Sequence, residues 1–100
     1  MITEEHNKEI VYQPIGGVKQ RAGMTRLESI LSEYRIPKNK FIREMGYDSD
    51  QFYYALNLKF KGIRKVDDVD IQLMILAFRN LGYDLKVSDL GLEVKDYKLG

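Results

Sequence analysis

The sequence predicts an all-α domain of about five short helices, and three observations support this fold class. Apolar residues recur at helical spacing in four segments between residues 25 and 82. Capping residues or a proline precede these segments, and Gly46 and Gly82 follow two of them. The chain has 100 residues, 44% of them hydrophobic and 31% charged, which suits one domain with a single modest core.

Residues 1–23 differ from the rest and predict an N-terminal extension. Ile10, Val11 and Tyr12 form a β-prone run, and the segment 14–17 has the composition of a turn before Val18. The extension is therefore expected to be a short β-hairpin or a flexible arm. Because an isolated hairpin is only marginally stable, it would pack on the helices, pair with a second chain or stay free.

The first two helices are predicted from caps and apolar spacing. Thr25 is an N-cap candidate, and Glu28 completes a capping box. The helix that follows buries Leu27, Ile30 and Leu31 and ends near Tyr34. Pro37 suits the first turn of the second helix, and Gly46 suits its end. The apolar face of this second helix would consist of Phe41, Ile42 and Met45.

The third helix would begin at Asp48 or Ser49 and bury Phe52, Ala55 and Leu56. A basic loop over residues 59–65 follows it, and Asp67 or Asp68 caps a fourth helix. The inner face predicted for that fourth helix consists of Val69, Leu73, Leu76, Ala77 and Leu81. Its further apolar residues, Met74, Ile75 and Phe78, place it at the centre of the core or in a dimer interface. A short turn around residues 88–90 closes a domain of residues 24–92, and residues 93–100 form a tail.

The composition argues against several classes of function. The chain lacks cysteine, has no apolar run of membrane-spanning length, and has glutamates where a signal peptide would be basic. We therefore expect a cytoplasmic protein. Its single histidine, His6, has no patterned partner, and helix capping explains Asp67, Asp68 and Asp70. No nucleotide-binding or nucleophile motif occurs, so the sequence predicts no enzyme, cofactor or metal site.

The charge is unevenly distributed along the chain. Residues 25–66 carry nine basic and five acidic side chains, a net of +4, whereas residues 67–100 have a net of −3. This central excess would suit a bound polyanion, although a solvated surface of mixed charge also explains it.

The segment 37–58, PKNKFIREMGYDSDQFYYALNL, resembles the helix-turn-helix of the lambda-repressor/Cro family. The resemblance extends over residues 24–90, where a preceding helix, a loop, a long fourth helix and a terminal turn follow the family's order. It implies a sequence-specific, repressor-like regulator of transcription, of phage or mobile-element type. Such a protein would be a homodimer that places the third helix in the major groove of double-stranded DNA.

Three positions depart from the family pattern. Ile42 stands where the family has a small residue, Ala55 where it has a large aliphatic residue, and Lys38 where it often has glutamine. The first two changes compensate in volume, which cores tolerate better than an unbalanced change.

The resemblance also implies which residues would contact DNA. The groove-facing positions would be Lys38, Ser49, Asp50, Tyr54 and Asn57, with Gln51 and Tyr53 beside them. Phosphate contacts would come from the basic loop, through Lys59, Lys61, Arg64 and Lys65. Lys19 and Arg21 of the extension would enter a minor groove, unless this segment is disordered or pairs with a second chain.

The sequence also supports an alternative function. Tyr53 and Tyr54 are consecutive on one helix with Phe52, so at least one tyrosine must be exposed. Because tyrosine is enriched in interface cores, the same helix could serve as a protein-interaction module, such as an antirepressor or an assembly factor.

Overall fold

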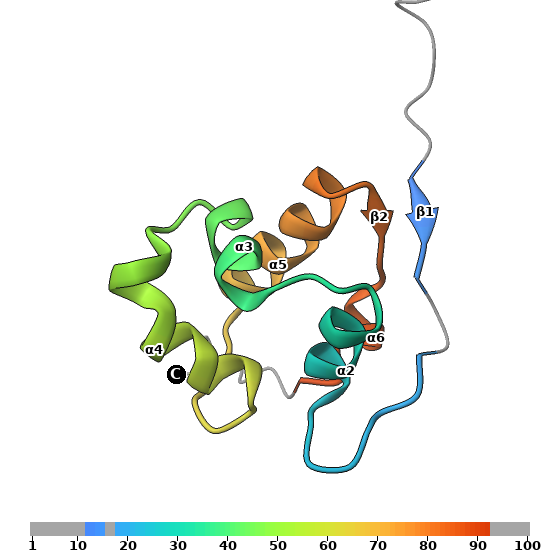
Figure 1. Cartoon of the computed structure of the whole chain (residues 1–100), viewed down its shortest axis with the longest axis horizontal. Helices are drawn as coiled ribbons and strands as arrows, with labels where there is room; N and C mark the ends of the chain where they lie inside the picture. The colour runs from blue at the N-terminus through green and yellow to red at the C-terminus, as the bar shows by residue number, and fades with distance from the viewer. Residues whose placement is uncertain (1–11, 16–17, 93–100) are drawn as a thin grey trace, which may run out of the picture.

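The computed structural model describes residues 12–15 and 18–92, and this part of the chain is mostly helical. Its five helices are α2 (Arg26–Glu33), α3 (Lys38–Glu44), α4 (Ser49–Phe60), α5 (Asp68–Asn80) and α6 (Val87–Leu90). Helix α3 packs on both α4 and α5, and α2 packs on α6 (Figure 1). The predicted all-α class with about five short helices is therefore confirmed. His6, Ile10 and Val11 and the tail 93–100 lie outside the described residues.

The helix boundaries follow the predicted caps. The Thr25 hydroxyl accepts from the Glu28 N–H at 3.1 Å, and the Glu28 carboxylate accepts from the Thr25 N–H at 3.0 Å, so the capping box is present. Asp48 caps α4 and Asp67 caps α5. Helix α4 extends to Phe60, so Lys59 lies in its last turn and the basic loop begins only at Lys61. Phe60 is fully buried, so the last turn of α4 contributes to the core.

Three phenylalanines from three helices form the centre of the core. The Phe41 ring of α3 lies 4.8 Å from the Phe78 ring of α5 and 5.7 Å from the Phe60 ring of α4. All three rings are fully buried. The predicted apolar faces of α2 and α3 are also buried: Leu27, Ile30, Leu31, Phe41, Ile42 and Met45.

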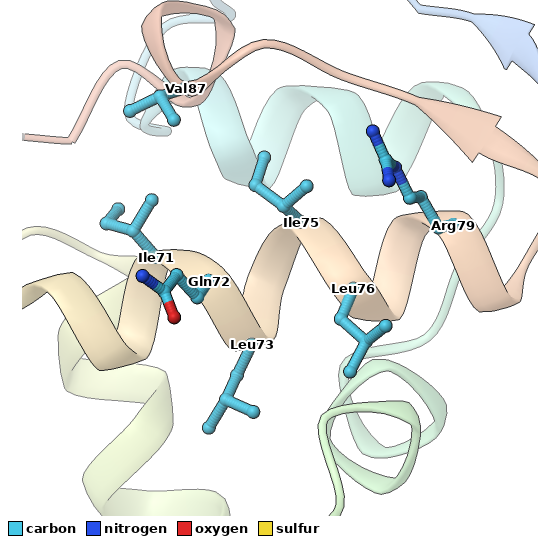
Figure 2. A pocket seen from close by; sticks show the side chains of 7 residues that line it. All are labelled: Ile71, Gln72, Leu73, Ile75, Leu76, Arg79 and Val87. Atoms are coloured by element: carbon cyan, nitrogen blue, oxygen red, sulfur yellow. The ribbon is translucent and has the colours of Figure 1, made fainter.

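The predicted inner face of α5 is wrong at Val69 and Leu76, which are 60% and 49% exposed. Ala77 is buried as predicted, and Leu73 and Leu81 are partly buried against the core. The buried positions of α5 are Asp70, Ile71, Met74, Ala77 and Phe78. Because apolar residues occur around most of this helix (Figure 2), periodicity alone did not determine which side meets the core.

The described part of the N-terminal extension pairs with the far end of the domain and forms no hairpin with residues 18–21. Strand β1 (Gln13–Pro14) runs parallel to β2 (Tyr83–Asp84), which follows α5. The Gln13 N–H donates to the Gly82 carbonyl at 2.9 Å, and the Ile15 N–H donates to the Asp84 carbonyl at 3.0 Å. Ile15 is 2% exposed, so this segment contributes to the core.

Candidate nucleic-acid interface

Helix α4 lies at one side of the molecule, joined to α3 by a short turn (Figure 1). Gly46 in this turn has φ of +98°, a conformation that glycine adopts without steric cost. The Asp48 carboxylate then accepts from the N–H groups of Asp50 and Gln51 at 2.9 and 3.3 Å. Asp48 therefore has the structural role that its position at a helix start predicts.

The outer side of the first two turns of α4 is open to solvent. Asp50 and Gln51 are exposed, Tyr53 is 37% exposed and Tyr54 is 74% exposed. The prediction that at least one tyrosine is exposed is confirmed. We call these four residues the α4 face. Its side chains provide one carboxylate, one amide and two phenols.

Two predicted base-contacting residues are held in a hydrogen-bond network inside the protein. The Lys38 ammonium donates to the Glu28 carboxylate and to the Asn57 side-chain carbonyl, both at 2.6 Å. Lys38 starts α3, Glu28 belongs to α2 and Asn57 to α4, so one cation connects three helices. We call these three residues the Glu28–Lys38–Asn57 network. Its bonds engage the Lys38 ammonium and the Asn57 side-chain oxygen, two of the groups that would contact a base.

The Glu28 carboxylate accepts hydrogen bonds from the Thr25 N–H and the Lys38 ammonium, and the Lys61 ammonium lies 3.5 Å from it. Burial tends to raise the pKa of its carboxyl group, but the Lys38 hydrogen bond, the Thr25 N–H and the charges of Lys38 and Lys61 outweigh burial and lower that pKa. The carboxylate thus stays ionised in the folded protein. The sequence analysis assigned Glu28 only to the capping box, because Lys38 and Asn57 are 10 and 29 positions away.

Ser49 is also part of the packed structure. It is 8% exposed, and its hydroxyl accepts from the Arg43 guanidinium at 3.1 Å. This burial leaves little of Ser49 open for contact with a base. The exposed α4 face therefore lacks three of the five groove-facing residues that the resemblance implies.

Lys59 connects α4 to the start of α5. Its ammonium lies 2.8 Å from a carboxylate oxygen of Asp70, whose side chain is 6% exposed. The same oxygen accepts from the Asp67 N–H at 3.1 Å and so completes the cap of α5. Asp67 accepts from the Asp70 N–H at 2.8 Å, and this bond is the largest cause of its lowered pKa. The structure therefore gives Lys59 an intramolecular partner.

Of the four predicted phosphate-contacting residues, the three in the segment 61–65 are exposed. Lys61 is 43% exposed and lies 3.5 Å from the Glu28 carboxylate. Arg64 and Lys65 are exposed, and the Arg64 side chain forms no ion pair within residues 12–15 and 18–92. The segment directly follows α4, so its cations lie at the C-terminal end of that helix.

The basic residues of the extension differ in their surroundings. Lys19 is exposed, whereas Arg21 is bound to α2. The Arg21 guanidinium donates to the Ser32 hydroxyl at 2.7 Å and to the Glu33 carboxylate at 2.9 Å, and the backbone N–H of Arg21 donates to the Ser29 hydroxyl at 2.9 Å. The prediction of a flexible arm is therefore wrong at Arg21.

No protein-family model, curated protein or solved structure matches this chain. Within the described residues, no helix has the length and apolar character that crossing a membrane requires. The same part of the chain contains no cluster of three or more histidine, cysteine or acidic residues suited to a metal ion. The resemblance to the lambda-repressor/Cro family therefore stays a prediction, and the functional argument depends on the residues themselves.

Proposed function

We propose that this protein binds double-stranded DNA through the α4 face and the basic segment 61–65. The observation that carries the proposal is the position of Lys61, Arg64 and Lys65, which are exposed immediately after a helix with an open outer side. Lysine and arginine that neutralise phosphates supply affinity without reading sequence.

On this proposal, sequence preference comes from few side chains. Gln51 can pair with an adenine edge, Asp50 can accept from a cytosine amino group, and Tyr54 can pack on a thymine methyl group. Because Lys38, Ser49 and Asn57 have intramolecular partners, we expect phosphate contacts to supply most of the affinity. The regulatory role that the resemblance implies would then depend on modest discrimination between DNA sequences.

A salt titration of binding to a random DNA duplex tests this function. The affinity should fall steeply with salt, and Arg64→Ala should reduce the slope of log K against log salt by about 0.9, the value for one phosphate contact. Lys86→Ala is the matched control, since Lys86 is an exposed cation beside α6, on the other side of the molecule from α4 (Figure 1). Absence of binding at low salt would refute the proposal.

The 74% exposure of Tyr54 favours protein docking as a second candidate function. A ring this open beside Tyr53 could insert into a pocket of a protein partner. Capture of that partner should then persist at salt concentrations that abolish DNA binding. Tyr54→Ala should reduce the capture at least about tenfold, which corresponds to 1.4 kcal/mol. Tyr54→Phe retains the ring and should retain most of the capture; equal capture by the wild type and Tyr54→Ala would exclude this role.

A further inference from the structure

Two side chains join the start of α2 to the end of α4 and to the basic segment 61–65. The Thr25 hydroxyl donates to the carbonyl of Phe60, the last residue of α4, at 2.7 Å. The Lys61 ammonium lies 3.5 Å from the Glu28 carboxylate. Glu28 therefore places a negative charge beside the first cation of a segment whose cations are proposed to meet DNA phosphates.

Glu28 has two cationic partners, and they differ in how firmly they are held. The Lys38 ammonium donates to one carboxylate oxygen at 2.6 Å, and the Lys61 ammonium lies 3.5 Å from the same oxygen. Lys38 has a second bond, to Asn57, and its side chain is 22% exposed, whereas the Lys61 side chain is 43% exposed. Lys61 can therefore move into solvent while Lys38 still balances the Glu28 charge. Of the two cations, Lys61 is the exchangeable one.

The Glu28 carboxylate, in contrast, is fixed in place. Its side chain is 7% exposed, and its second oxygen accepts from the Thr25 N–H at 3.0 Å in the capping box of α2. A carboxylate oxygen and a phosphate oxygen both attract an ammonium group. A phosphate that approaches Lys61 must therefore compete with Glu28. Arg64, which forms no ion pair within residues 12–15 and 18–92, has no such competitor.

We propose that Glu28 competes with DNA phosphates for Lys61 and thereby limits the affinity of the protein for DNA. The inference rests on the proposed function and concerns a residue outside the α4 face and the segment 61–65. In the free protein Lys61 pairs with Glu28, and in the complex its ammonium exchanges the carboxylate oxygen for a phosphate oxygen. Loss of the first pair offsets part of the gain from the second. Lys61 therefore contributes less affinity than a lysine without an acidic neighbour would.

Glu28→Gln tests this competition, because it removes the charge and keeps the size of the side chain. Its affinity for a random DNA duplex at low salt should be about two- to fivefold higher than that of the wild type, the effect of one partly exposed ion pair. Glu28→Gln should bring no gain when it is added to Lys61→Ala. Glu33→Gln is the matched control, because it removes the same charge from the exposed Arg21–Glu33 pair and should leave the affinity unchanged.

Two results of this experiment would overturn the proposal. One is equal affinity of Glu28→Gln and the wild type. The other is a gain that persists in the Lys61→Ala background, since the released cation would then be Lys38. A wild type that fails to bind DNA at low salt would instead refute the proposed function, and this inference with it, so the two failures are distinguishable.

A comparison of two cations tests the same competition in a protein that keeps Glu28, and so does not require Glu28→Gln to fold. Lys61→Ala is compared with the wild type, and Arg64→Ala with Arg64→Lys, so that each comparison removes one lysine. The loss of DNA affinity should be at least about twofold smaller at position 61 than at position 64. Circular dichroism verifies that all these variants fold. An equal or larger loss at position 61 would contradict competition by Glu28.

Discussion

Replacing Phe41 with alanine is expected to lower the free energy of unfolding by about 3–5 kcal/mol. The Phe41 ring is fully buried and contacts Phe60 and Phe78, so its removal leaves a cavity where α3, α4 and α5 meet. Surrounding helices can fill such a cavity only in part. Urea denaturation monitored by circular dichroism measures the loss. Because the domain is small, the variant is expected to be unfolded in part at 37 °C.

Tyr54→Ala is the matched control for this experiment. It removes an aromatic ring from the exposed side of α4 and should change the free energy of unfolding by about 0.5 kcal/mol or less. Similar losses for the two variants would contradict the central position of Phe41 in the core.

The sequence predicts correctly those elements that depend on residues close together in the chain. The capping box of Thr25 and Glu28, the turn at Gly46 and the apolar faces of α2 and α3 all depend on residues within one or two helical turns of each other. Strand β1 depends on a partner about 70 positions away, so its pairing with Tyr83 was not predictable from its own residues.

The candidate site was predicted as a segment but not as a set of free side chains. Positions 38, 49 and 57 are where the resemblance places groove contacts, yet the side chains there bond to Glu28, Arg43 and each other. These bonds depend on how the helices meet, and helical periodicity contains no information about that. Exposure of Tyr54 was predictable because three consecutive aromatic residues cannot all face one core.

The Glu28–Lys38–Asn57 network makes stability depend on pH in a direction that the structure determines. The pKa of Glu28 is lowered in the folded protein, so folding favours its ionised form. Its contribution is fully present above the ordinary pKa of about 4.5 and is lost as pH falls through the lower folded-state pKa. Asp67, whose pKa is also lowered, acts in the same direction at the start of α5.

Glu28→Gln should therefore lower the free energy of unfolding by about 1–3 kcal/mol at pH 7, because it leaves the partly buried Lys38 ammonium without its counter-charge. The difference from wild type should shrink as pH falls below the ordinary pKa of 4.5 and should vanish once the pH passes below the lowered folded-state pKa, where Glu28 is protonated. Some pH dependence should remain in the variant, since Asp67 is unchanged. Urea denaturation at a series of pH values measures both effects.

Glu33→Gln is the control, because the Arg21–Glu33 pair is about half exposed and should contribute little at any pH. If the free energy of unfolding of the wild type and of Glu28→Gln changed in parallel with pH, the ionised Glu28 carboxylate would not stabilise the fold.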